Sequence, residues 1–274
     1  MDEDTALFDL EIRVLLEAVF RRYQHDFRDY AVTSVRRRVE QAMQHFGCDS
    51  VAELQHKLLR DPQLFSHALG FFTVQLSELF RDPLYFLALR RHVVPVLQTY
   101  PSVKVWVAGC STGEEVWSLA ILLAEEGLLE RSIVYATDIN AESLRIAQSG
   151  VYEIDRLATF SRAYRESGAK RSLSDYYTAA YGSALFDKAL AKNVVFSDHS
   201  LATDSVFAEV QLVSCRNVLI YFNTQLQERA IALFRESLVR KGFLGLGSRE
   251  SLRAIQGGAG FTEVVREDRI FQKL

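Results

Sequence analysis

The most informative stretch of the sequence is a short segment rich in glycine and acidic residues. It spans Gly109–Glu115, follows the apolar run Val103–Ala108 and precedes the apolar run Trp117–Leu123. This order predicts a strand, a turn and a helix, where small residues let a nucleoside approach the backbone and the helix offers free N–H groups. No Lys or Arg lies between Lys104 and Arg131, which disfavours a pyrophosphate. A cofactor with hydroxyls and a positive charge fits better, and S-adenosylmethionine (SAM) is the candidate.

A second candidate binding residue, Asp138, ends the next predicted strand, 25 residues after Gly113. A carboxylate at the tip of that strand can accept hydrogen bonds from both hydroxyls of a ribose. The alternative is a structural role, in which Asp138 or Asn140 caps the predicted helix Ala141–Ser149. The glycine turn that precedes Asp138 favours the ribose role.

The segment Cys215–Phe222 follows the fourth predicted strand. In a doubly wound sheet this position faces the ligand crevice. Arg216, Asn217 and Tyr221 therefore supply three polar groups where an enzyme would use them. In the alternative interpretation, the apolar residues of the segment fill the core and these three side chains face solvent.

Two polar rows lie in the first third of the chain. Gln75, Ser77 and Arg81 form one of them, and its periodicity favours an amphipathic segment with a solvated face. The other row lies opposite the apolar stripe of a predicted helix and is either a solvated face or a docking site for an acidic partner. Its members are Arg36, Arg37 and Arg38.

The first 100 residues are predicted to be helical. Thr33 or Ser34 is expected to cap the second helix, and Ser50 the helix Val51–Leu59. The first helix, Ala6–Tyr23, has its apolar positions near a 3.6-residue period. They are Leu7, Leu10, Val14, Leu15, Ala18 and Val19.

From residue 103 onward, short apolar strands alternate with helices, which predicts a parallel sheet covered on both faces. The C-terminal segments Thr262–Arg266 and Arg269–Gln272 are typical of an antiparallel hairpin that closes one edge. We expect a helical domain at 1–82, a linker helix at 83–101 and an α/β domain at 102–274, with a small β-subdomain inserted at about 153–193. The predicted strands of the parallel sheet are Val103–Ala108, Ile133–Thr137, Val194–Ser197, Val210–Ser214 and Phe243–Gly247.

Composition argues against several classes of protein. The apolar fraction of 49%, the charged fraction of 24% and the net charge of −3 are typical of a soluble globular protein, not of a non-specific nucleic-acid binder. No apolar run reaches the roughly 18 residues of a membrane span, so direct membrane insertion is not expected. The six histidines and three cysteines have no metal-ligand spacing, so no metal site is expected.

Together these motifs resemble those of the CheR family of chemoreceptor glutamate O-methyltransferases, in order and over nearly the whole chain. The family's Asn-x-Thr-x-Phe-Phe-Arg motif corresponds to Gln75–Arg81, and Ala-x-Ser-Thr-Gly-Glu-Glu to Gly109–Glu115. The later motifs are Ser/Thr-Asp-Ile at Thr137–Ile139, Ser-Gly-x-Tyr at Ser149–Tyr152, Cys-Arg-Asn-Val-x-Ile-Tyr-Phe at Cys215–Phe222 and a Gly-His-Ser-Glu-Ser-like strand end at Gly247–Ser251.

The resemblance implies a SAM-dependent methyltransferase fold, with a doubly wound, mostly parallel seven-stranded sheet. Arg81 and Tyr221 are then the residues nearest the transferred methyl. The family has Asn and Thr where this chain has Gln75 and Ser77, and it has Asn-Leu where this chain has Ser200-Leu201. We therefore expect the affinity for SAM to differ from that of other family members. The residues implied to line the SAM site are Gln75, Ser77, Arg81, Gly109, Glu115, Asp138, Ser200, Leu201, Arg216 and Asn217.

The implied reaction yields S-adenosylhomocysteine and a methyl ester on a glutamate of the cytoplasmic helical bundle of a chemoreceptor. A glutamate with a pKa of about 4.3 is ionised at pH 7, so no general base is required. The resemblance also makes Arg36, Arg37 and Arg38 a receptor contact, and it implies a cytoplasmic monomer. A methyltransferase with another acceptor, or a non-catalytic SAM-binding module, is the alternative.

Some family members bind a C-terminal receptor peptide through a glycine-rich loop in the inserted subdomain. The corresponding stretch here, Tyr177–Asp187, contains one glycine, Gly182. The sequence therefore predicts that methylation does not depend on such a tether.

Overall fold

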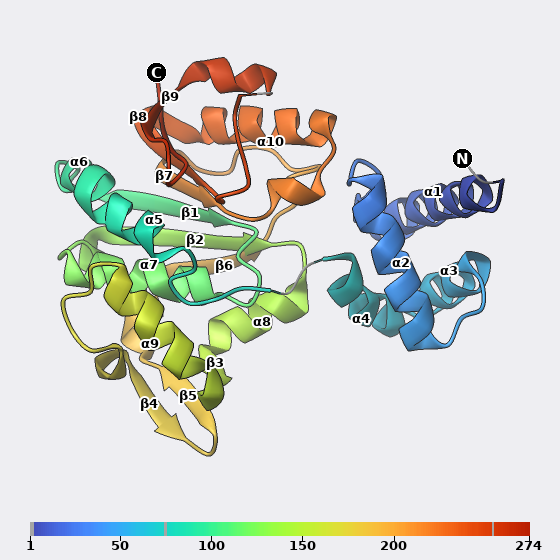
Figure 1. The fold of residues 1–274 in the computed structure, drawn as a ribbon, viewed down its shortest axis with the longest axis horizontal. Helices are drawn as coiled ribbons and strands as arrows, with labels where there is room; N and C mark the ends of the chain where they lie inside the picture. The colour runs from blue at the N-terminus through green and yellow to red at the C-terminus, as the bar shows by residue number, and fades with distance from the viewer. Residues whose placement is uncertain (1–2, 74–75, 254) are drawn as a thin grey trace.

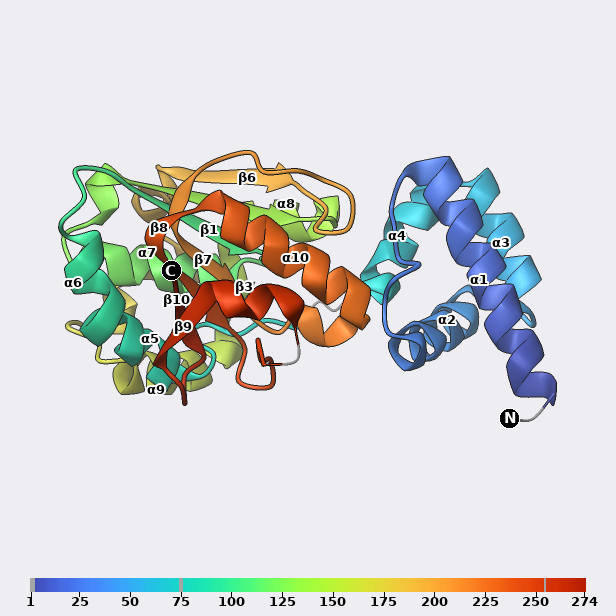
Figure 2. The same ribbon diagram turned by 90° about the horizontal axis from the view of Figure 1, so that it is seen from above.

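The computed structural model describes residues 3–73, 76–253 and 255–274 (Figure 1). Four helices form an N-terminal domain, and a sheet domain lies beside it, as the turned view also shows (Figure 2). Within these residues, no helix combines the length and apolar character that crossing a membrane requires.

The N-terminal domain consists of α1 (Glu3–Tyr23), α2 (Val32–Phe46), α3 (Val51–Arg60) and α4 (Pro62–Phe72). Its shared core is apolar and contains residues from all four helices. The side chain of Ser50 accepts a hydrogen bond from the amide of Glu53, as expected, and Asp61 caps α4 in the same way. Each cap satisfies backbone donors that the first turn of the helix leaves free.

Two local predictions in this domain were wrong. In α1 the predicted face was wrong in part: Leu15 and Val19 are buried as expected, with Ile12 and Leu16 beside them, but Leu7, Leu10 and Val14 are 51–58% exposed. Because α1 carries apolar residues around much of its circumference, periodicity alone did not select the buried face. Helix α2 starts at Val32 after Ala31, which has no side-chain cap. Ala31 instead donates its backbone N–H to the sheet domain.

The main sheet has seven strands in the order β6-β2-β1-β7-β8-β10-β9. The first five pair in parallel, and β10 is antiparallel to both β8 and β9, so the predicted mostly parallel sheet with a C-terminal hairpin is confirmed. In chain order the strands are β1 (Val103–Ala108), β2 (Ser132–Asp138), β6 (Val194–Asp198), β7 (Val210–Cys215), β8 (Leu238–Leu246), β9 (Phe261–Val265) and β10 (Ile270–Lys273).

Helices cover both faces of this sheet (Figure 1). Successive side chains of a strand point to opposite faces. Val105 and Val107 therefore pack in one core with residues of α7 (Glu114–Glu125), whereas Trp106 packs in a second core with residues of α10 (Thr224–Ser237). On the side of α7 lie α5 (Pro83–Ala88), a π-helical turn (Leu89–Val93) and α6 (Val94–Leu97), and α8 (Ala141–Ser149) follows β2.

The stretch between α8 and β6 forms the expected small β-subdomain, with strand order β3-β5-β4. Both pairings are antiparallel. It includes three short helical turns, at Ile154–Arg156, Leu173–Tyr176 and Lys188–Ala191. Its other elements are β3 (Val151–Glu153), α9 (Leu157–Glu166), β4 (Tyr177–Ala180) and β5 (Ser183–Phe186).

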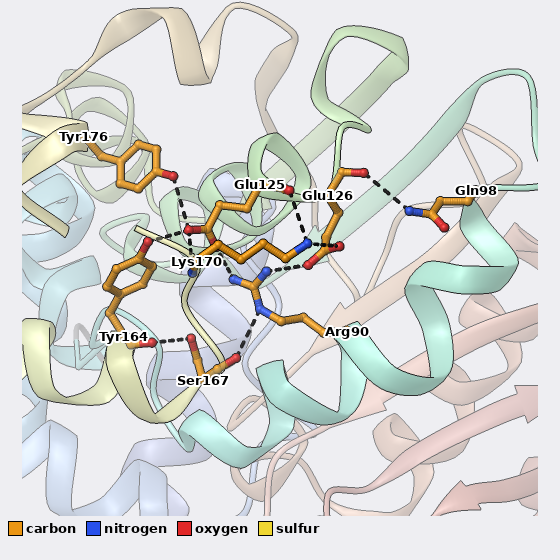
Figure 3. A network of polar contacts seen from close by, with 8 residues as sticks. All are labelled: Arg90, Gln98, Glu125, Glu126, Tyr164, Ser167, Lys170 and Tyr176. Carbon is orange, nitrogen blue, oxygen red and sulfur yellow. Dashed lines mark hydrogen bonds and ion pairs between the residues drawn. The ribbon is translucent and has the colours of Figure 1, made fainter. Parts of the chain in front are cut away.

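A buried ionic network ties this subdomain to the sheet domain (Figure 3). Arg90 donates to the carboxylates of Glu125 and Glu126 at the end of α7, and to the carbonyl of Ser167 after α9 at 3.1 Å. Tyr164 donates its hydroxyl to Glu125 as well. Because the Arg90 and Glu125 side chains are 6% and 0% exposed, each charge depends on its partner for solvation.

The domain division drawn from the sequence remains a proposal. Leu79 and Phe80, which that division assigns to the helical domain, belong to the core under the sheet, as do residues of the proposed linker helix such as Phe86 and Leu89. The core of the helical domain extends to Phe72.

Candidate functional site

A cleft lies at the carboxyl ends of the parallel strands, beside β1 and β7. The chain places β2 and β6 on one side of β1 and then β7 and β8 on the other, so the strand order reverses at this point. Such a switch point is where open α/β sheets bind ligands. The cleft encloses about 910 Å³ of space, a volume that includes the part open to solvent. Its walls come from both domains. They are Tyr30, Arg38, Thr73, Leu76, Ser77, Arg81, Gly109, Cys110, Ser111, Glu115, Asp138, Ile139, His199, Ser200, Leu201, Ala202, Arg216, Asn217, Val218, Tyr221 and Phe222.

The glycine turn forms the floor of this cleft. Gly109 has φ of +72°, and an added Cβ would lie 2.5 Å from Val218 Cγ2, so a larger residue would be strained and would push against the opposite loop. Gly109 and Cys110 both donate to the carbonyl of Thr137 at 2.9 Å, which fastens the turn to the end of β2.

Asp138 organises the same turn. One of its oxygens accepts the Ser111 N–H at 2.8 Å and the other accepts the Asn140 N–H at 3.0 Å. The cap of α8 is Asn140, whose side chain accepts from Glu142 and Ser143, so Asp138 remains at the cleft wall. Burial raises the pKa of Asp138, and the backbone N–H groups of Asn140 and Ser111 oppose that rise.

Arg216 joins three parts of the site. It donates to Glu115 of α7 at 3.0 Å, to Asp82 at 2.8 Å and to the carbonyl of Arg81 at 2.8 Å. Its guanidinium lies over the Tyr85 ring, 4.2 Å from the centroid. The side chain of Arg216 is 1% exposed, and it links the sheet to the segment 76–82 before α5, which we call the strap.

The polar and apolar residues of the strap face different surroundings. Ser77 and Arg81 line the cleft, while Leu79 and Phe80 are buried in the core, so the row is not simply a solvated face. Phe80 has φ of +53°, and Ser118 Oγ accepts its N–H at 2.8 Å. Gln75, the remaining member of the predicted row, lies outside the described residues.

The loop after β7 presents its polar residues to the cleft and packs apolar residues in the core. Arg216, Asn217 and Tyr221 line the cleft, while Leu219 fills the core behind them. Asn217 has φ of +61°, an uncommon conformation for a residue with a side chain.

A buried carboxylate, Glu250, holds this loop from below. It accepts the N–H groups of Gly247 at 2.6 Å, Asn217 at 3.0 Å and Ile220 at 3.3 Å. Burial raises its pKa, and these backbone bonds oppose the rise. Sequence reasoning assigned Glu250 no role, although it lies in the Gly247–Ser251 motif. The available signal was an acid among small residues just after a buried strand.

The three neighbouring arginines of α2 do not form one surface patch, which corrects the prediction for this row. Arg38 is 3% exposed, donates to the carbonyl of Phe72 and lies over the Tyr221 ring, 4.6 Å from its centroid. Arg36 pairs with Asp9 at 2.7 Å, and Arg37 is exposed. Successive residues of a helix are about 100° apart, so three in a row cannot share one face.

Ser200 and Leu201 form a rim of the cleft after β6. The backbone N–H of Ser200 donates to Asp204 at 2.8 Å, which folds the segment into a turn. Tyr30, Thr73 and His199 also line the cleft and were not among the predicted site residues. Tyr30 lies far from the motifs in sequence, and only the docking of the two domains brings it here. Thr73 and His199 lie within two residues of the predicted Gln75 and Ser200, so that proximity was an available signal for both.

Several buried polar atoms of the cleft have no hydrogen-bond partner within the described part of the chain. They include Ser111 Oγ and Asn217 Oδ1. A buried polar atom without a partner costs roughly 1–3 kcal/mol. A ligand with hydroxyl, amine and ammonium groups would provide partners, and the cleft carboxylates Glu115 and Asp138 suit its positive charge. The polar groups of the cleft therefore fit SAM.

Comparison with known proteins agrees with this site. Residues 75–265 match the family described as "CheR methyltransferase, SAM binding domain", and residues 10–73 match "CheR methyltransferase, all-alpha domain". The chain belongs to the CheR methyltransferase family. It is a SAM-dependent methyltransferase, and the resemblance inferred from its motifs is confirmed.

Relatives within this family support the same assignment. The chain is 54% identical over 265 residues to "Putative methyltransferase Cher3" of Pseudomonas putida, covering 97% of each chain. It is 29% identical to "Chemotaxis protein methyltransferase" of Salmonella typhimurium, covering 97% of this chain and 89% of that one. It is 34% identical to "Chemotaxis protein methyltransferase 2" of Pseudomonas aeruginosa, covering 68% of each.

Proposed function

We propose that this protein transfers the methyl group of SAM to glutamate side chains in the cytoplasmic helical bundle of chemoreceptors. The observation that carries the proposal is the composition of one cleft. The cleft carboxylates Glu115 and Asp138 suit the cofactor, and the cleft cations Arg38 and Arg81 suit an anionic acceptor. The relatives named as chemotaxis methyltransferases support the choice of acceptor.

In this proposal Asp138 accepts the ribose hydroxyls and Glu115 faces the positively charged methionine portion. Backbone N–H groups of Ser111 and Asn140 bind different Asp138 oxygens, and a carboxylate has further acceptor sites for hydroxyls. Both terminal nitrogens of Arg216 are engaged by protein oxygens, and we assign to Arg216 the role of orienting Glu115. The other proposed binding residues are Gln75, Ser77, Arg81, Gly109, Ser200, Leu201 and Asn217.

Bound SAM supplies a methyl group on a sulfonium, and the new carboxyl O–C bond forms as the S–C bond breaks, with no proton to move. The glutamate acceptor is already ionised near pH 7, so the protein needs no general base. Its main tasks are alignment of the reacting groups and exclusion of water. We assign alignment of the carboxylate to Arg81 and Tyr221.

Arg81 is suited to this role because its restraint is light. It donates to the carbonyl of Leu76 at 3.3 Å and lines the cleft. A weakly held guanidinium can orient a carboxylate without the tight pairing that would reduce its nucleophilicity.

The test uses methyl-tritiated SAM, receptor-containing membranes and mild alkali. Label on a receptor-sized band that alkali releases as methanol is the expected result, since a carboxyl methyl ester hydrolyses to methanol. Alkali-stable label would point to another acceptor. Binding of SAM without any transfer would favour a non-catalytic module and would contradict the proposal.

The Arg81→Ala variant tests the assigned alignment in the same assay. We expect kcat to fall by about 10²-fold, the loss that misplaced reacting groups can cause. Unchanged methyl transfer would exclude the proposed role of Arg81.

We also propose that methylation is independent of a receptor-tail tether, because the β4–β5 turn presents Tyr181 and Gly182 rather than a glycine-rich loop. Calorimetric titration with the isolated C-terminal receptor peptide should detect no tight binding. Micromolar affinity would contradict this part of the proposal.

A further inference from the structure

The loop that presents Tyr221 is held by both domains. Within the sheet domain, the N–H of Tyr221 donates to the carbonyl of Val218 at 3.1 Å. From the helical domain, the N–H of Ala31 donates to the carbonyl of Tyr221 at 2.8 Å. The backbone on either side of the Tyr221 Cα is therefore fixed by a different domain, which limits the directions available to the phenol.

The contact continues on either side of this hydrogen bond. The N–H of Asn223 donates to the carbonyl of Asp29 at 2.8 Å, and the Asn223 side chain donates to Asp29 Oδ1 at 3.0 Å. Tyr30 and Phe222 form an antiparallel bridge with ring centroids 5.0 Å apart. We call these two segments, Asp29–Ala31 and Tyr221–Asn223, the clasp.

The clasp is packed against the cores of both domains. Tyr30 packs against the core of the helical domain and against the core on the α10 side of the sheet. Figure 2 shows the loop before α2 beside the segment that leads into α10. Arg38 of α2 also contacts the clasp, because its guanidinium lies over the Tyr221 ring.

We propose that the clasp positions Tyr221 for methyl transfer, so that the helical domain is a part of the catalytic site as well as a neighbour of it. Asp29 and Ala31 are then positioning residues, which act through Tyr221. This inference rests on the proposed function, in which Tyr221 lies near the transferred methyl group.

Ala31→Pro breaks the central hydrogen bond of the clasp. Ala31 has φ of −59° and ψ of +123°, which proline adopts readily, but proline has no N–H, and its ring would meet the Tyr221 carbonyl. The matched control is Val32→Pro, one residue later. Val32 is exposed at the first position of α2, where proline is favoured, and Ala31 has the extended conformation required before proline.

We expect Ala31→Pro to lower kcat at least tenfold while the Kd for SAM, measured by calorimetry, changes less than twofold. Val32→Pro should retain wild-type values of both. In a Tyr221→Phe background, Ala31→Pro should cost less than twofold further, because the clasp acts through that side chain. Equal losses in the two backgrounds, or a parallel loss of SAM affinity, would overturn the proposal.

A second pair of variants tests the side-chain half of the clasp. Asp29→Ala should lower kcat by about threefold, whereas Asp29→Asn, which keeps an acceptor oxygen for Asn223, should recover most of the loss. Indistinguishable kcat values for Asp29→Ala and the wild-type protein would exclude a positioning role for Asp29.

Two readouts on the full chain need no substrate. Hydrogen exchange at the Asn223 amide, and the fluorine resonance of 3-fluorotyrosine introduced at position 221, should change in Ala31→Pro and not in Val32→Pro. If they change while the wild-type protein methylates no receptor, the proposed function fails and the positioning stands. If the receptor is methylated and Ala31→Pro leaves kcat and both signals unchanged, the positioning is wrong and the function stands.

Discussion

The carboxylate of Asp138 uses both of its oxygens to hold the backbone around the glycine turn, at Ser111 and Asn140. The same group lines the cleft. A single residue thus shapes the loop and presents a charge to the ligand, because a carboxylate has more acceptor sites than backbone N–H groups can occupy.

Replacing Asp138 with Asn tests the charge and hydrogen bonding of this side chain while nearly preserving its shape. The amide has nearly the same shape but one acceptor oxygen and no charge, so it loses a charge-assisted hydrogen bond, which is worth roughly 1.5–3 kcal/mol. We expect the Kd for SAM, measured by calorimetry, to rise about 10- to 100-fold. Glu142→Gln, an exposed change on α8, is the control and should bind as the wild type does. Wild-type affinity in Asp138→Asn would exclude the ribose role.

The same carboxylate predicts a pH dependence of SAM binding. Burial raises the pKa of Asp138, so protonation begins at a higher pH than in an exposed aspartate. Since the charged form is the better acceptor, affinity should weaken as the pH falls through this raised pKa and should be constant above it. Calorimetry from pH 7 downward checks this, and a profile identical to that of Asp138→Asn would assign the dependence to another group.

At the scale of elements, the junction of β1 and α7 depends on close approach. Gly113 has φ of +91°, and an added Cβ would lie 2.5 Å from Ala147 Cβ and 2.7 Å from Ala147 Cα, on α8. The turn therefore needs glycine both for its backbone conformation and for the contact between two helices that follow neighbouring strands.

The Gly113→Ala variant should be destabilised beyond the cost of backbone strain. Gly47 is the matched control, because it also has a positive φ, +59°, but has nothing within 4 Å of an added Cβ. Gly47→Ala should lower the free energy of unfolding by about 1–2 kcal/mol. Urea unfolding should give a clearly larger loss for Gly113→Ala. Equal losses would mean that the α7–α8 contact accommodates a methyl group.

Element positions were well predicted where the periodic signal was strong and poorly where it was not. The parallel strands and the C-terminal hairpin appear at or within a few residues of their expected positions. The start of α2 was missed, because a tertiary hydrogen bond from Ala31 sets it and no capping side chain does. The buried face of α1 was partly wrong for the related reason that neighbours, not periodicity, choose among apolar faces.

For the whole molecule, the cleft is an interdomain site, with Tyr30, Arg38 and Thr73 from the helical domain facing the strand ends. The Asn140 side-chain amide donates to Thr73 Oγ1 at 3.2 Å, which adds a further contact between the domains. The receptor glutamate in the proposed function must therefore enter where both domains meet.

Receptor recognition should depend on Arg37 rather than on the whole arginine row. Arg37 is exposed on α2, whereas Arg36 is paired with Asp9 and Arg38 is buried. We expect Arg37→Glu to raise the KM for receptor about tenfold, equivalent to about 1.4 kcal/mol, with the Kd for SAM unchanged.

The control for this experiment is Arg240→Glu, an equal charge change at the amino end of β8, opposite the cleft. Methylation rates at varied receptor concentration measure both variants. Equal KM values for the two would show that Arg37 does not meet the receptor.

The sequence by itself determined the family, the order of strands and helices, and the residues of the local motifs. These follow from short-range patterns: small residues in a turn such as Gly109 and Gly113, an acid at a strand end such as Asp138, and period-2 or period-3.6 apolarity. Such patterns are written in neighbouring residues, so they can be read without knowing the fold.

Only the tertiary structure decided which groups act together. It placed Arg38 over Tyr221 instead of on the surface, joined Ala31 to the loop after β7, and put Glu250 beneath that loop. These partners are separated by tens to nearly two hundred residues, and each contact results from docking whole elements against one another. No local pattern encodes such a contact, because its energy is gained only when both surfaces are already folded.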